Sequence, residues 1–89
     1  MDAFIAQNLK PFSKNTLQAF FDLKVFDGII LKGLTFHQRD GKSWVGLPAK
    51  RIEKDGQKTW VQVVEFENED SSRAFQRAAV KAVEDLLRD

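Results

Sequence analysis

Basic and aromatic side chains alternate through the middle of this chain. The basic residues stand in stretches rich in turn-forming residues: Arg39, Lys42, Lys50, Arg51, Lys54 and Lys58. Trp44 and Trp60 stand in the apolar runs beside them. Phosphates attract cations and unpaired bases stack on aromatic rings, so the combination is typical of single-stranded nucleic-acid binders. Charged loop tips and core tryptophans are also ordinary in a folded sheet, and Asp40, Glu53 and Asp55 dilute the basic charge.

Residues that would support catalysis or metal binding are sparse. The chain has no cysteine and one histidine, His37, and a lone histidine on a strand is more often structural than catalytic. No serine lies in a nucleophile-elbow pattern, and the five glycines form no phosphate-binding loop. The acidic run 67–70 suits the start of a helix better than a cation site. We therefore expect a protein that is not an enzyme, with no catalytic residue, no cofactor, no metal and no small-molecule substrate.

Length and composition favour a single folded domain over residues 1–89. A chain of 89 residues has no room for a second core, and 43% hydrophobic residues fit a globular protein. The absence of cysteine excludes a disulfide scaffold and is compatible with a reducing cytosol. The first residues lack a signal-peptide pattern, and no run reaches the roughly 18 apolar residues of a membrane span. We expect a cytoplasmic protein with no membrane partner.

The distribution of charge is uneven although the net charge is only +1. Residues 1–58 contain ten Lys and Arg against six Asp and Glu, whereas residues 59–89 contain four against seven. This asymmetry predicts a weakly basic surface on the half of the chain that precedes residue 59.

Four runs have the pattern of strands. They span residues 16–26, 29–38, 43–47 and 59–66. Asp27-Gly28 and Asp40-Gly41 predict tight hairpin turns, because a type I′ turn needs positive φ at both central positions. Pro48 ends the third run because it has no N–H to donate, and residues 49–58 read as a longer loop. We interpret residues 1–15 as an irregular N-terminal arm.

The periodicity changes to that of a helix after residue 66. Apolar residues from Phe75 to Leu87 fall on one helical stripe, and the start can be capped by Asp70, Ser71 or Ser72. The sequence therefore predicts an α+β fold. Its parts are a four-stranded antiparallel β-meander within 16–66 and one C-terminal α-helix, 70–88, packed on one face.

Four segments resemble, in order, parts of the SpoVG (stage V sporulation, or septation, protein) family of bacteria. The segments are LQAFFDLKV, DGIILKGLTFHQRDGKSWVGLPAKR, DGQKTWVQVVEF and RAFQRAAVKAVEDL, and they cover roughly residues 17–88. The most specific motif is LPAKR at 47–51. The first 16 residues have no counterpart, and VEFENEDSS replaces the family's polar-aromatic, proline-containing run.

The resemblance implies a small α+β protein that dimerises through its sheet and binds DNA and RNA as a regulator. The family's nucleic-acid contacts are basic residues beside its Pro-Ser/Ala-Lys-Arg segment and at the start of its helix. These positions correspond to Lys50 and Arg51, with Lys54 as a neighbour, and more loosely to Arg73 and Arg77. Both tryptophans then become packing residues.

Two functions from different classes follow from these patterns. The first is a non-enzymatic, homodimeric regulatory protein that binds DNA, RNA or both. The alternative is a protein-interaction module without nucleic-acid binding. In that case a partner covers the sheet face with Phe20 and Phe26, which the helical stripe leaves uncovered.

Overall fold

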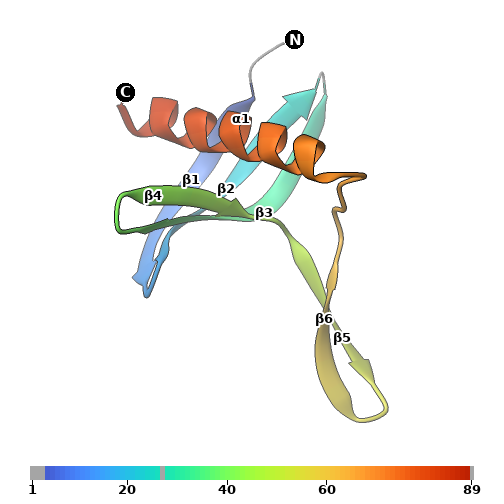
Figure 1. Ribbon diagram of the computed structural model, residues 1–89. Helices are drawn as coiled ribbons and strands as arrows, with labels where there is room; N and C mark the ends of the chain where they lie inside the picture. The colour runs from blue at the N-terminus through green and yellow to red at the C-terminus, as the bar shows by residue number, and fades with distance from the viewer. Residues whose placement is uncertain (1–3, 27, 89) are drawn as a thin grey trace.

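The chain folds into a four-stranded sheet, a separate two-stranded sheet and one long helix (Figure 1). The computed structural model describes residues 4–26 and 28–88. The larger sheet contains β1 (Ile5–Lys14), β2 (Leu17–Phe26), β3 (Ile29–Arg39) and β4 (Lys42–Gly46). The smaller sheet pairs β5 (Ala49–Lys54) with β6 (Gln57–Gln62), and the helix is α1 (Glu69–Arg88).

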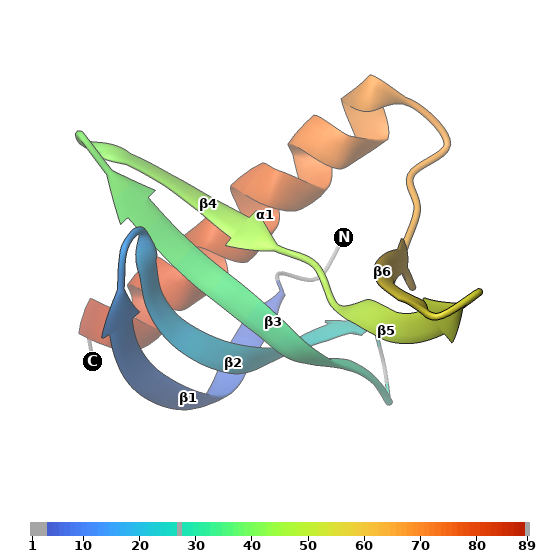
Figure 2. The same ribbon diagram turned by 90° about the horizontal axis from the view of Figure 1, so that it is seen from below.

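The predicted α+β class is confirmed. The strands of the larger sheet are antiparallel in the order β1-β2-β3-β4, and α1 crosses one face of this sheet (Figures 1 and 2). Alternation along β2 turns its odd-numbered apolar residues toward the helix. The buried core comprises Ala6, Ala19, Phe21, Leu23, Val25, Leu34, Phe36, Val45, Ala79, Ala82 and Val83. We call the opposite side of the larger sheet its outer face.

The predicted irregular N-terminal arm is wrong for most of its length, because Ile5–Lys14 forms β1 at the edge of the larger sheet. Its alternation is hidden by register shifts between Gln7 and Lys10 and between Pro11 and Lys14. Asn8 has a φ of 54°, which breaks the period-two pattern. Residues 1–3 lie outside the described residues.

The prediction of residues 59–66 as the fourth strand of the larger sheet is also wrong. Residues 59–66 were expected to extend the sheet, yet β6 ends at Gln62 and pairs only with β5. The expected loop 49–58 contains β5 itself. The reason is local, because Asp55 and Gly56 have φ values of 52° and 76° and form a two-residue turn that joins its own flanking strands. The larger sheet still has four strands because β1 supplies the missing one.

The turn between β3 and β4 follows the sequence prediction. Asp40 and Gly41 have φ values of 51° and 78°, as a type I′ turn requires. A two-residue turn fixes the register, so Arg39 lies opposite Lys42 and His37 lies opposite Trp44. The other predicted turn includes Asp27, which lies outside the described residues.

Helix α1 begins at Glu69, one residue before the predicted start, and its cap differs from the prediction. Asn68, rather than Asp70, Ser71 or Ser72, provides the capping side chain. Its Oδ1 accepts a hydrogen bond from the backbone N–H of Ser71 at 2.8 Å. This bond satisfies one of the free donors of the first turn.

The contact that fixes α1 against the sheet joins Gln76 to the backbone of Val45. The Gln76 Nε2 donates to the Val45 carbonyl at 2.8 Å, and the Val45 N–H donates to Gln76 Oε1 at 2.9 Å. β4 is an edge strand, so these backbone groups have no strand partner on the open side. The amide of Gln76 therefore takes the place of a fifth strand at this residue.

We expect Gln76→Met to lower the free energy of unfolding by about 1–3 kcal/mol, because two partly buried backbone groups lose their partner. Urea denaturation followed by circular dichroism measures this. The matched control is Ala74→Met, an exposed position of the same helix, with an expected change within about 0.5 kcal/mol. Equal stability of the two variants would contradict the role of Gln76.

Candidate functional site

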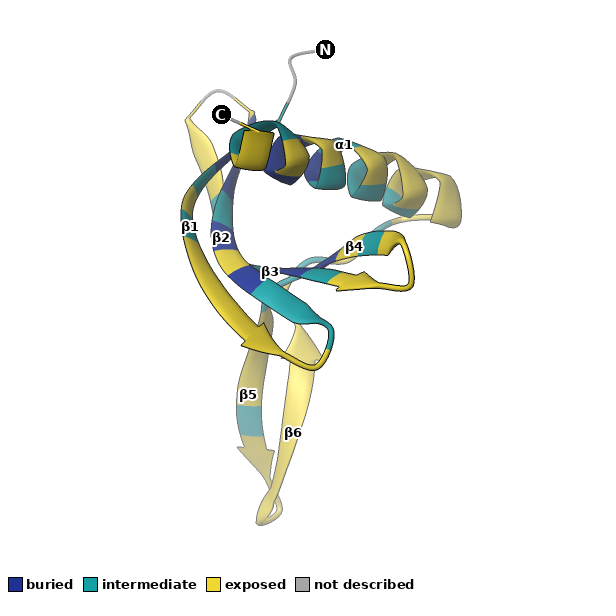
Figure 3. Ribbon diagram, turned by 90° about the vertical axis from the view of Figure 1, so that its left-hand side faces the viewer, coloured by how far each residue is buried: buried dark blue, intermediate teal, exposed yellow. Residues whose placement is uncertain are grey.

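The β5–β6 hairpin projects from the body of the molecule on the side away from α1 (Figures 1 and 3). Every residue of its strands is exposed except the half-buried Ile52. The exposed residues include Trp60, at 68%, and Val61, and Val63 beyond β6 is exposed as well. An isolated two-stranded hairpin is marginally stable in water, and clustered exposed apolar residues mark interaction surfaces. The prediction that both tryptophans are packing residues is therefore wrong for Trp60.

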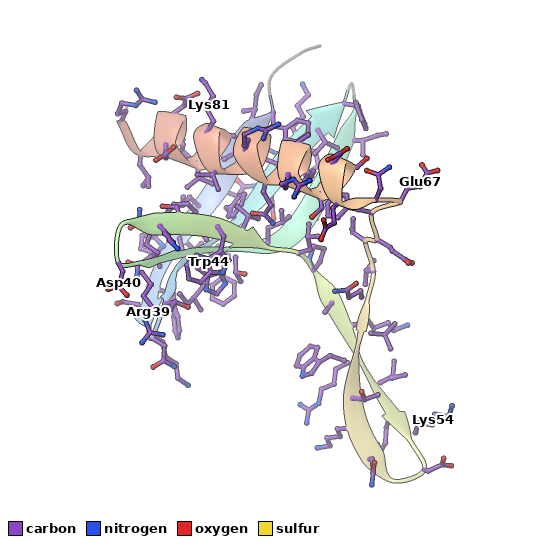
Figure 4. All side chains as sticks on the ribbon, viewed as in Figure 1. Arg39, Asp40, Trp44, Lys54, Glu67 and Lys81 are labelled. Carbon is purple, nitrogen blue, oxygen red and sulfur yellow. The ribbon has the colours of Figure 1, made fainter. Side chains whose placement is uncertain are left out.

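The hairpin separates the basic residues that the sequence places together. Alternation puts Lys50 and Lys54 on one face of the hairpin, where Lys50 lies opposite Val61. Arg51 lies on the other face, directly opposite Trp60. Lys54 lies near the tip (Figure 4). The pair Lys50-Arg51 is thus no single patch, and the hairpin presents cations on both faces.

The two predicted helix residues lie apart from the hairpin, since α1 covers the opposite side of the larger sheet (Figure 3). The Arg73 guanidinium contacts Asp70 at 2.8 Å and Glu69 at 3.8 Å, in exposed pairs within the first turns of α1. Arg77 is exposed and lines a shallow groove with Ser43 and Val80. The structure therefore does not bring Arg73 and Arg77 together with Lys50, Arg51 and Lys54.

A second cluster of aromatic residues lies on the outer face of the larger sheet. Trp44 points away from α1 (Figure 4), and its ring stacks on that of His37 with centroids 5.5 Å apart and planes at 3°. The His37 Nδ1 and Nε2 lie 3.0 and 2.9 Å from the Oγ1 atoms of Thr16 and Thr35. Any side chain at Gly46 would overlap Thr35 Oγ1, so the glycine makes room for this cluster.

Reasoning from the sequence did not identify this stack, although the necessary signal is present. Counting outward from the two-residue turn Asp40-Gly41 pairs Arg39 with Lys42 and then His37 with Trp44. A cross-strand pair of this kind has side chains on the same face and in contact.

Two groups of the outer face have shifted pKa values. Burial lowers the pKa of His37, because it disfavours the charged imidazolium. The Asn8 amide, more than the Gly33 N–H and the neighbouring lysines, lowers the pKa of the Asp22 carboxyl. Asp22 accepts hydrogen bonds from Asn8 Nδ2 at 3.0 Å and Gly33 N at 3.2 Å, and thereby links β1, β2 and β3.

Neither a metal centre nor a membrane-spanning helix is found in the described part of the chain. Within residues 4–26 and 28–88, no three His, Asp or Glu side chains group so that they could hold a metal ion. No helix in these ranges has the length and apolar character that crossing a membrane requires. No protein-family model, curated protein or solved structure matches the chain. The candidate site is therefore defined by the hairpin and the outer face themselves.

We expect the stability of the protein to fall between about pH 7.5 and pH 5.5, because the unfolded chain protonates His37 more readily than the folded one. The pKa of His37 in the folded chain lies below the ordinary value of 6.5. The contribution of His37 to stability is therefore complete above pH 6.5 and is lost as the pH falls from there through the folded pKa. Asp22 and Asp85, with pKa values lowered from 3.8, titrate below this window. Thermal unfolding at both pH values measures the change.

The comparison variant is His37→Gln, which keeps polar atoms beside Thr16 and Thr35 but does not titrate. Its two melting temperatures should differ less than those of the unmodified chain. A wild-type protein that is equally stable, or more stable, at the lower pH would refute the assignment of the shift to His37.

Proposed function

We propose that this chain is a non-enzymatic regulatory protein that binds DNA or RNA as a homodimer, as its resemblance to the SpoVG family implies. The observation that carries the proposal is the exposed β5–β6 hairpin. It bears four basic residues against two acidic ones, together with the exposed Trp60. The basic residues are Lys50, Arg51, Lys54 and Lys58.

The geometry of the hairpin suits a polyanion that surrounds it. The major groove of a duplex admits a two-stranded ribbon, and such a ribbon meets phosphates on both sides. Lys50 and Lys54 on one face and Arg51 on the other can then contact both walls of a groove. Contacts of this kind neutralise phosphates and position the protein without reading sequence.

A second copy of the chain is the simplest way to stabilise the hairpin. Two strands alone are marginal, and a third or fourth strand or an apolar cover is needed for independent stability. Trp60, Val61 and Val63 give the base of the hairpin the apolar surface that such a cover requires. We assign the dimer contact to the apolar residues at this base and the nucleic-acid contact to the basic residues of β5 and of the tip, among which Lys50 and Arg51 lie opposite Val61 and Trp60.

The double variant Lys50→Ala/Arg51→Ala should bind labelled oligonucleotides at least about tenfold more weakly at low salt, because two phosphate contacts are lost. The slope of log K against the logarithm of the salt concentration should be less steep by roughly 1.5, because two fewer phosphates are neutralised. Fluorescence anisotropy at several salt concentrations measures both quantities.

The matched control is Arg73→Ala/Arg77→Ala, which removes the same charge from α1 and should change binding less. The proposal fails if the wild-type chain binds no oligonucleotide at micromolar concentration, and the assignment of binding to the hairpin fails if the hairpin variant binds as tightly as the wild type. Sedimentation of the free protein at twice the 10.2 kDa of one chain supports the dimer, and sedimentation at 10.2 kDa argues against it.

The alternative function, a protein-interaction module, is favoured by a different observation. Phe26 and Ile29, at the far end of β2 and β3, are 61% and 51% exposed. An apolar contact with a protein partner survives high salt, whereas phosphate neutralisation does not. Salt dependence therefore separates the two functions.

A further inference from the structure

The outer face of the larger sheet presents an aromatic stack at its edge. Trp44 and His37 lie opposite each other, and β4 is the last strand of the sheet. No further strand of this sheet covers the indole face turned away from His37, and Trp44 is 37% exposed. Hydroxyl groups of Thr16 and Thr35 hold His37 in place. The open indole face is therefore pre-positioned for a further flat ring.

Two cations lie beside this stack, on the side toward the β3–β4 turn. Arg39 and Lys42 form the next cross-strand pair on the same face, and Figure 4 shows Arg39 on the same side of the sheet as Trp44. Like charges directly opposite each other destabilise a sheet, and an anion between them removes that cost. Neither side chain forms an ion pair with a described residue. The acidic residues nearby are Asp40 at the tip of the turn and Glu84 of α1, which line one hollow together with Arg39 and Lys42.

The outer face carries a second aromatic pair. Phe12 and Phe20 lie 5.7 Å apart between ring centroids, and both are exposed. Phe20 borders a groove that is also lined by Lys10 and Lys32. The Asp22 carboxylate in this groove is already held by the Asn8 amide and the Gly33 N–H. Aromatic rings with adjacent cations thus recur across the face.

We propose that the outer face binds a single strand of nucleic acid, with an unpaired base stacked on the open face of Trp44. The adjoining phosphate lies between Arg39 and Lys42, and Phe12 and Phe20 offer a second stacking surface. This inference rests on the proposed function but adds a site distinct from the hairpin. Bases in a duplex are already stacked and paired, so Trp44 favours single strands over duplexes.

The direct test is the fluorescence of Trp44 in the variant Trp60→Phe, where Trp44 is the sole tryptophan. Oligothymidylate and oligouridylate of about ten nucleotides are the probes. A base stacked on the indole quenches its emission, so we expect quenching that saturates together with binding. The two probes report whether the DNA strand, the RNA strand or both occupy the face. Unchanged emission with both probes at saturating binding would overturn the proposal.

Affinities of substituted chains provide the second test. Trp44→Leu should bind the single-stranded probes about tenfold more weakly, because one stacked base is lost. Trp44→Phe should recover part of that loss, and the affinity for a blunt duplex should stay constant. An equal loss for duplex and single strand, or no loss, would refute base stacking on Trp44.

The two sites fail in different ways. If Lys50→Ala/Arg51→Ala binds like the wild type while Trp44→Leu loses single strands, the hairpin site is refuted and the stacking site stands. The reverse pattern refutes the stacking site and leaves the hairpin site. Circular dichroism of each variant verifies that it is folded.

Discussion

The double hydrogen bond between Gln76 and the backbone of Val45 is the contact on which the rest of the arrangement depends. It holds α1 on one face of the sheet while the Val45 side chain enters the core. Because successive residues of a strand point to opposite faces, Trp44 and Gly46 must then face away from the helix. The bond that closes the core thereby also determines which aromatic residue is presented on the outer face.

The distribution of ion pairs divides the basic residues into two groups. Within the described residues, all four ion pairs lie in α1, where Arg73, Lys81 and Arg88 contact carboxylates three or four positions away. The basic residues of the sheet and the hairpin form no such pair among the described residues. The cations of the sheet and the hairpin, and Arg77 of α1, are thus without an ion pair among the described residues. Both proposed sites use cations of the sheet and the hairpin.

Much of the fold could be predicted from sequence, because alternation and the Asp-Gly turn chemistry are local signals. The α+β class, β2, β3 and the helix follow from them. β1 could not be predicted, because bulges around Asn8 and Pro11 interrupt its alternation. The hairpin was not predicted because Asp55-Gly56 was placed inside a loop, although the same Asp-Gly turn signal that is correct at 40–41 also pairs residues 49–54 with 57–62. The stack of His37 on Trp44 could have been predicted from the sequence, because the two-residue turn at 40–41 fixes their pairing.

The most direct test of where nucleic acid binds is the amide and indole spectrum of the isotope-labelled protein during titration with a single-stranded oligonucleotide. Two indole N–H signals, from Trp44 and Trp60, report the outer face and the hairpin separately. We predict shifts of both indole signals and of amides along β3 to β6, with little change along α1. Shifts confined to α1 around Arg73 and Arg77, or none at all, would contradict the assignment of binding to the hairpin and the outer face.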